Sequence, residues 1–165
     1  MSDQTLPSKI LIVDNDISSA KQISNSLERY KIVSTVASNW EEAMYHFNTS
    51  LFDLCVVELA LNDMPGTALI QKWRNHESPI KQNTAFVLAT AGQNTETDDA
   101  LIRELGDVEI IKKPISLPSL LSVMVKALAQ SQNRGKLTEI NSKVIDPLLK
   151  LEKYEKALKI AKDSL

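Results

Sequence analysis

The chain has 165 residues, of which 43% are hydrophobic, and a formal net charge of −2, values typical of a globular domain with a short additional segment. No apolar run approaches the roughly 18 to 20 residues that span a bilayer, and residues 1–7 are polar, so we expect a cytoplasmic protein with no membrane partner. Residues 1–129 hold 11 Lys and Arg against 16 Asp and Glu, residues 130–165 hold 8 against 5, and neither part is basic enough to indicate nucleic-acid binding.

Short apolar runs alternate with amphipathic segments through residue 130. The apolar runs predict strands at residues 9–13, 32–37, 52–58, 84–89 and 108–111. Apolar residues at three- and four-residue spacing predict helices at residues 17–30, 67–77, 95–105 and 117–128, and a further helix that begins after Asn39. Asp16, Asn39 and Ser116 are each suited to cap the helix that follows. The alternation predicts a doubly wound α/β domain, in which helices cover both faces of a five-stranded parallel sheet.

The run that ends at Glu58 is the most informative of the five. Residues 52–59 are almost continuously apolar, which is typical of a strand buried on both faces of a parallel sheet. Cys55, the single cysteine, lies within this run, so we expect a buried thiol with no redox role. Glu58 therefore places a carboxylate at the sheet edge where open parallel sheets bind their ligands.

The sequence predicts three parts along the chain. We place the α/β domain at residues 1–130, of which residues 7–130 suffice for the fold. Residues 131–136 form a polar, glycine-containing stretch that we interpret as a linker. Residues 137–165 are rich in Lys, Leu and Glu with helical apolar spacing, and predict a C-terminal helical segment. Such a segment cannot bury its own apolar stripe, so we expect it to pack on the domain, on a second copy of the chain, or on further helices. Because its pattern reaches residue 165 without a capping signal, we expect the chain to be a fragment of a longer protein.

Polar residues follow four of the predicted strands. Parallel topology brings the ends of the first, third, fourth and fifth strands to one edge of the sheet. We therefore expect one shared pocket that contains Asp14, Asn15, Asp16, Glu58, Thr90 and Lys113.

Four motifs in this order carry a resemblance to a known family. They are Ile-Val-Asp-Asn-Asp at residues 12–16, the strand that ends at Glu58, Leu-Ala-Thr-Ala at residues 88–91, and Lys-Lys-Pro at residues 112–114. Together they resemble the CheY-like receiver domain of two-component response regulators over about residues 8–130. The resemblance implies a phosphorelay signal transduction module, a strand order of 2-1-3-4-5, and a cis peptide bond between Lys113 and Pro114.

The resemblance also implies roles for the residues at the strand ends. In that family, two acidic residues after the first strand and an Asp that ends the third strand hold Mg²⁺, and this Asp accepts the phosphoryl group. A Thr hydroxyl and a Lys ammonium then bind the phosphoryl oxygens. Asp14 matches the first acidic position, Thr90 the hydroxyl position and Lys113 the ammonium position.

Two departures from the family pattern oppose phosphorylation. Glu58 stands at the acceptor position, and its extra methylene displaces the reacting oxygen by about 1 Å, which costs about a hundredfold in a reaction that depends on alignment. Asn15 stands at the second acidic position and offers a neutral oxygen instead of a charged one. We expect no cofactor and at most weak Mg²⁺ binding, by Asp14 and Glu58.

A third departure concerns the switch residues. The family usually carries Tyr or Phe on the fifth strand, where this chain has Ile110, so the usual relay from Thr90 lacks its aromatic arm. We infer a pseudo-receiver that acts by binding. Glu58 either mimics the phosphorylated state, by reaching toward Thr90 and Lys113, or simply pairs with Lys113 and stabilises the fold.

Three functional readings follow. The first is a non-enzymatic module that binds signalling proteins, or a second copy as a homodimer, through its fourth helix, fifth strand and fifth helix and through its C-terminal helices. The second is an active receiver that is phosphorylated on Glu58 or on a nearby residue such as Asp63. The third is an α/β enzyme or nucleotide-binding protein. The sequence lacks the glycine-rich phosphate loop that this interpretation requires.

Residues 154–158 are similar to the turn into the second helix of a tetratricopeptide repeat. Ile145 stands where that repeat has a small residue, and Pro147 interrupts the preceding helix. A linker helix or a dimerising helix is the alternative interpretation. Helical repeats would make protein binding the output of the chain.

Overall fold

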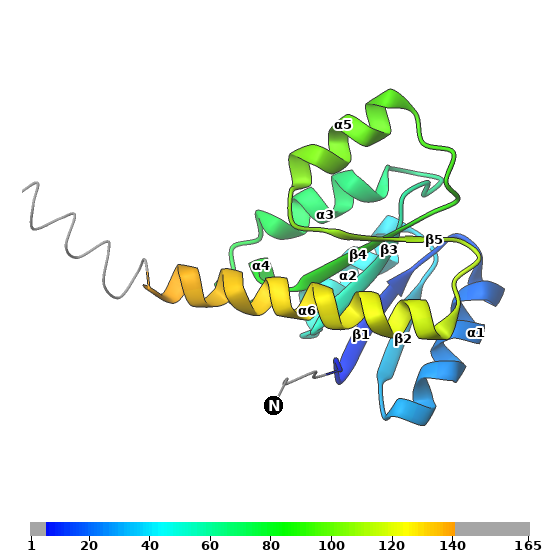
Figure 1. Cartoon of the computed structure of the whole chain (residues 1–165), viewed down its shortest axis with the longest axis horizontal. Coiled ribbons are helices and arrows are strands. Elements are labelled where there is room, and N and C mark those ends of the chain that lie inside the picture. Colours follow the sequence, from blue (N-terminus) through cyan, green and yellow to red (C-terminus); the bar gives the residue numbers. More distant parts are fainter. Residues whose placement is uncertain (1–5, 141–165) are drawn as a thin grey trace, which may run out of the picture. The chain divides into compact units, whose positions relative to one another are not determined.

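The computed structural model describes residues 6–140 of the chain, and the side chains of residues 6–132. In this part of the chain, five parallel strands form one sheet in the order β2-β1-β3-β4-β5 (Figure 1). The strands are β1 (Lys9–Val13), β2 (Val33–Ala37), β3 (Leu54–Glu58), β4 (Ala85–Thr90) and β5 (Glu109–Lys112). The helices are α1 (Ile17–Leu27), the short η1 (Glu28–Tyr30), α2 (Trp40–Thr49), α3 (Gly66–Arg74), α4 (Pro79–Gln82), α5 (Glu96–Leu105) and α6 (Leu117–Ile140). The predicted fold class and strand order are confirmed.

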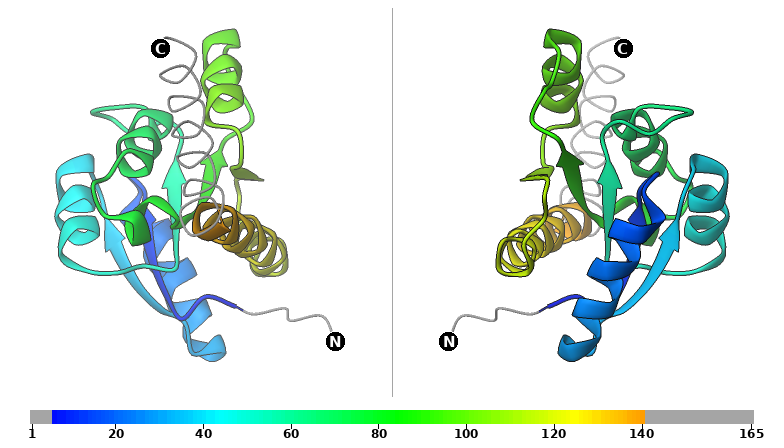
Figure 2. Two further views of the ribbon diagram at one scale, coloured as in Figure 1. Left: turned by 90° about the vertical axis from the view of Figure 1, so that its left-hand side faces the viewer. Right: turned by 90° about the vertical axis from the view of Figure 1, so that its right-hand side faces the viewer.

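Helices cover both faces of the sheet, as Figure 2 shows from the two sides. Because successive side chains of a strand point to opposite faces of the sheet, each central strand contributes side chains to two separate cores, one on each face. Cys55 and Val57 of β3 pack with residues of α2, α3 and α5, whereas Leu54 and Val56 pack with residues of α1 and α6. Every residue of β3 is buried, and burial raises the pKa of the Cys55 thiol well above its usual range. A strand buried on both faces was the expectation from its continuous apolar run.

The helices begin where capping residues stand. Asp16 caps α1 by accepting a hydrogen bond from the Ser19 amide at 3.2 Å, and Asn39 caps α2 by accepting one from the Glu42 amide at 2.9 Å. Thr95 caps α5 and forms a capping box with the side chain of Asp98. These caps fix where each helix leaves the sheet edge.

Two helical features differ from the sequence prediction. The helix expected at residues 67–77 ends at Arg74, and the separate single turn α4 follows Ser78, with Pro79 at its first position. The helix predicted as the fourth is therefore α5 here, and the one predicted as the fifth is α6.

The C-terminal helix is longer than expected. α6 continues to Ile140, so residues 131–136, predicted to be a linker, are helical. Polar residues are compatible with helical structure, and the one glycine in this stretch costs only about 1 kcal/mol relative to alanine. The chain divides into two compact units at residue 131. Residues 141–165, including the repeat-like stretch at 154–158, lie outside the described residues, and their helical-repeat interpretation stays a prediction.

None of the helices within residues 6–140 combines the length and the apolar character that crossing a bilayer requires.

Candidate functional site

Three strands deliver buried polar side chains to the carboxyl edge of the sheet. The register pairs Val13 of β1 with Val57 of β3, and Glu58 with Ala89 of β4, so these strands end at nearly the same level. Asp14, Glu58 and Thr90 are only 5%, 7% and 3% exposed, respectively. Buried polar groups are stable only when they have partners, so the contacts of these side chains define the chemistry of the edge.

Lys113, which follows β5, joins the two buried carboxylates. Its Nζ donates to Asp14 Oδ2 at 2.8 Å and forms an ion pair with Glu58 Oε2. Burial by itself lowers the pKa of Lys113, but the hydrogen bonds and charges of Asp14 and Glu58 outweigh burial and raise that pKa above its usual value. The ammonium therefore stays protonated between the two carboxylates. The next peptide bond, Lys113–Pro114, is cis, as the resemblance implied.

Asn15 connects two loops of the site. Its side-chain Nδ2 donates to the Ala60 carbonyl at 2.7 Å, and its Oδ1 accepts from the Asn62 amide at 3.1 Å. Ala60 and Asn62 both belong to the loop between β3 and α3. A carboxylate at position 15 has no proton to donate to the Ala60 carbonyl, so the amide is the side chain that makes both bonds.

Asp16 binds Ser19 in the first turn of α1. Its two carboxylate oxygens accept hydrogen bonds from the Ser19 hydroxyl at 2.8 Å and the Ser19 amide at 3.2 Å. These bonds hold the pKa of the Asp16 carboxyl below its usual value, and the bond from the Ser19 hydroxyl has the larger effect. Asp16 thus acts as a helix cap, as the sequence predicted.

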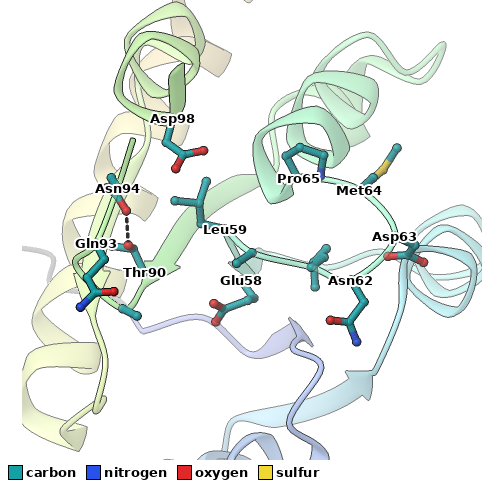
Figure 3. A pocket seen from close by; sticks show the side chains of 13 residues that line it. Glu58, Leu59, Asn62, Asp63, Met64, Pro65, Thr90, Gln93, Asn94 and Asp98 are labelled. Atoms are coloured by element: carbon teal, nitrogen blue, oxygen red, sulfur yellow. Dashed lines mark hydrogen bonds between the residues drawn. The ribbon is translucent and has the colours of Figure 1, made fainter. Parts of the chain in front are cut away.

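The expected shared pocket is divided into two cavities. Asp14, Asp16 and Lys113 line a cavity of about 420 Å³ beside α1. Glu58 and Thr90 line a different cavity of about 350 Å³, formed by the loops after β3 and β4 (Figure 3). The Lys113 ammonium lies between the carboxylates of Asp14 and Glu58, so the residues expected to share one pocket meet in one ion cluster.

Thr90 does not contact Glu58 through a hydrogen bond. Its hydroxyl donates to Asn94 Oδ1 at 2.6 Å (Figure 3). The same hydroxyl accepts from the Gly92 amide at 3.1 Å. A mimic of the phosphorylated state would draw this hydroxyl toward position 58. The observed contacts therefore favour simple pairing of Glu58 with Lys113 over mimicry.

The family resemblance implies a Mg²⁺ ion, and the donor set here does not fit it. Mg²⁺ requires near-octahedral oxygen ligands, usually with carboxylates among them. The Asn15 oxygen is bonded to the Asn62 amide, and both carboxylates face an ammonium. Within the described residues, no three His, Cys, Asp or Glu side chains gather closely enough to hold a metal ion.

Ile110 occupies the position where the resemblance expects an aromatic switch residue. It lies on β5, paired in register with Leu88, and is 42% exposed. β5 forms one edge of the sheet, so this apolar side chain lies at the surface of the domain.

Two residues matter to the site that sequence reasoning did not single out. Asn94 binds the Thr90 hydroxyl, and nothing in its local sequence indicates that contact. Gly66 packs so closely on β3 that a Cβ atom there would lie 2.2 Å from the Glu58 carbonyl oxygen. The Pro65-Gly66 turn signal in the sequence was compatible with this approach but did not identify it.

Comparison with known proteins gives a consistent result. Residues 10–125 match the family described as the response regulator receiver domain. The alkaline phosphatase synthesis transcriptional regulatory protein PhoP of Bacillus subtilis is 31% identical over 121 residues, which is 73% of this chain and 48% of that protein. Response regulator protein PilR of Pseudomonas aeruginosa is 29% identical over 123 residues, 73% of this chain and 26% of PilR. The chain thus matches about half or less of the length of these relatives.

Solved structures show the same fold. A CheY-like receiver domain protein from Methanospirillum hungatei superposes with a TM-score of 0.67 at 22% identity, covering 79% of this chain and 99% of that one. The receiver domain of the Francisella response regulator 1452 gives a TM-score of 0.61 at 26% identity, covering 76% and 98%.

Proposed function

The chain belongs to the response regulator receiver domain family, and we propose that it transmits signals through protein contacts without accepting a phosphoryl group. The proposal makes it a binding module rather than an enzyme, with no cofactor of its own.

The main support for this proposal is the position of the Lys113 ammonium. It forms ion pairs with both Glu58 and Asp14. The ion pair holds Glu58 through Oε2 and fixes its carboxylate beside Lys113, and the extra methylene would misplace the attacking oxygen by about 1 Å. Both effects act against phosphoryl transfer to this residue.

Asn15 supports the proposal independently. Phosphoryl transfer relies on a metal ion to neutralise charge on the transferring group. Asn15 contributes no charge to such an ion, and both polar ends of its side chain are engaged by the loop after β3. The Asn15 side chain is thus already engaged by hydrogen bonds within the protein.

Signal output would then depend on surfaces. We propose that α5, β5 and α6 bind a signalling protein or a second copy of the chain, since β5 is an edge strand and Ile110 on it is exposed. The C-terminal helices would add contacts of their own. Transcriptional regulation, named for some of the relatives, is not part of this proposal, because the family match ends at residue 125.

Intact-mass spectrometry after incubation with Mg²⁺ and acetyl phosphate tests the proposal. We expect no phosphoryl adduct on the natural chain. A double variant, Asn15→Asp with Glu58→Asp, restores the family's donors at both positions and should gain one phosphoryl group.

The alternative is an active receiver that uses Glu58 or Asp63. Asp63 is an exposed residue whose Oδ2 accepts from the Trp40 amide at 3.2 Å. A phosphoryl adduct on the natural chain would refute the proposal, and the matched variants Glu58→Gln and Asp63→Asn would show which carboxylate carries it.

A further inference from the structure

Arg74, at the end of α3, binds the turn that leads from α5 into β5. Its Nη1 donates to the carbonyl oxygen of Leu105, the last residue of α5, and its Nη2 donates to the carbonyl oxygen of Asp107. We propose that Arg74 is a clamp that fixes α5 and β5 relative to α3, and that it thereby keeps the face formed by α5, β5 and α6 in one conformation. The inference rests on the proposed function, because that face is the surface through which the function would act.

The guanidinium group is suited to this role by its geometry. It is planar and presents its N–H donors as a rigid fork, so one side chain can bind two carbonyl oxygens at once. The Leu105 carbonyl is among the last four of α5, which have no partner within the helix, and a cation at that end also interacts favourably with the helix dipole. The two bonds span Gly106, whose φ of 72° turns the chain out of the helix. Arg74 thus connects α3 to both sides of this turn.

The Arg74 side chain is itself fixed on its other side. Its guanidinium carbon lies 5.7 Å from the centre of the Phe86 ring, which belongs to β4. The preceding residue, Trp73, is fully buried and stacks on the same ring with a centroid distance of 6.0 Å. These contacts hold the guanidinium at the sheet. A shift of α5 would therefore break two hydrogen bonds to a charged group at once.

The beginning of α5 is held in a different way. Thr95 and Asp98 form the capping box, and Asn94 accepts the hydrogen bond from the Thr90 hydroxyl. These contacts fix where the helix starts, but they all lie within residues 90–98 and do not set the position of α5 relative to another helix. Arg74 supplies such a connection at the other end, where α3 and α5 lie side by side (Figure 1).

The clamp acts on the proposed binding face without being part of it. Ile110 lies on β5, three residues beyond Asp107, and its side chain is 42% exposed. β5 is an edge strand, which pairs with β4 on one side only, so its position depends on what holds its ends. Arg74 holds the end that leads in from α5. We therefore expect the face to have one conformation before any partner binds.

Relaxation-dispersion NMR on the full chain measures whether the face exchanges between conformations on the microsecond to millisecond timescale. We expect flat profiles for the Ile110 methyl group and for the amides of residues 101–111 in the natural chain. Arg74→Met keeps a long apolar stem and removes the donors. It should introduce exchange at both probes and speed amide hydrogen exchange at residues 101–111 by about tenfold to a hundredfold, because two bonds to a charged group are lost.

Matched variants separate a clamp from a purely local contact. Arg103→Met makes the same substitution at an exposed arginine in the last turn of α5 and should change hydrogen exchange less than about twofold. Arg74→Lys keeps the charge without the fork and should give an intermediate effect, which carries the test if Arg74→Met does not fold. A local contact would alter only residues 104–108, whereas a clamp also affects the Ile110 methyl group and leaves the protection of β1 unchanged.

Dispersion at residues 101–111 of the natural chain would overturn the proposal. Equal effects of the Arg74 and Arg103 variants, or faster exchange spread evenly over the whole sheet, would overturn it as well. None of these outcomes bears on whether the chain accepts a phosphoryl group, which intact mass measures separately.

Discussion

Replacing Lys113 by Met should destabilise the domain strongly, because two buried carboxylates would lose their shared counterion. The side chains of Asp14 and Glu58 are each 8% exposed, and that of Lys113 is 26% exposed. Removing one partner of a fully buried ion pair costs about 3 to 5 kcal/mol, and the partial exposure of Lys113 places the expected loss near the lower end, about 3 kcal/mol. With a urea m-value of about 2 kcal/mol per molar, the unfolding midpoint should fall by roughly 1.5 M.

Urea unfolding followed by circular dichroism measures this loss. Lys112→Met is the matched control, since Lys112 is the exposed neighbour, and we expect it to change the free energy of unfolding by less than about 0.5 kcal/mol. Adding Glu58→Gln to Lys113→Met leaves one unpaired carboxylate instead of two, and should recover about half of the loss. If Lys113→Met costs no more than its control, or if Glu58→Gln recovers nothing, the assignment of Lys113 as counterion to both carboxylates is wrong.

Three further predictions follow from the same site. Stability contributed by the raised pKa of Lys113 should be fully present below pH 10.5, the ordinary lysine value, and should disappear as pH rises through the higher pKa of the folded state. Urea midpoints measured between pH 9 and 12 should show this loss of stability. The Lys113→Met variant should not show it. Asn15→Asp, which abolishes the bond donated to the Ala60 carbonyl, should lower the free energy of unfolding by about 1 to 2 kcal/mol without Mg²⁺, and an unchanged urea midpoint would contradict the two-loop connection. Gly66→Ala should lower the free energy of unfolding by about 3 kcal/mol, because its Cβ would lie 2.2 Å from the Glu58 carbonyl oxygen. If the variant unfolds thermally at the same temperature as the natural chain, the backbone shifts freely there.

The fold could be predicted from sequence because its signals are local and agree with one another. The apolar run through Cys55 indicated a strand buried on both faces, and Asp16 and Asn39 indicated helix starts through side chains that bond within three residues. The end of a helix was harder to predict where local preference was weak. The polar stretch at residues 131–136 has no strong breaker other than one glycine, and it continues the helix.

The site could be predicted less completely, because its contacts join residues distant in sequence. Parallel topology correctly implied that Asp14, Glu58 and Lys113 approach one another. It could not show that the ammonium separates two cavities, nor that the Thr90 hydroxyl binds Asn94. Those outcomes depend on side-chain rotamers and loop conformations. The cytoplasmic location also stays a prediction.

The bond between Lys113 and Asp14 joins residues 99 positions apart in the chain. It forms only when the last strand lies next to a sheet that already contains the first, so it closes a loop that encompasses nearly the whole domain. We predict that this contact forms after the main folding barrier is crossed, because closing so long a loop costs chain entropy before the contact can offset it. The ion pair should therefore govern how slowly the domain unfolds more than how quickly it folds, and its loss should shorten the lifetime of the native state.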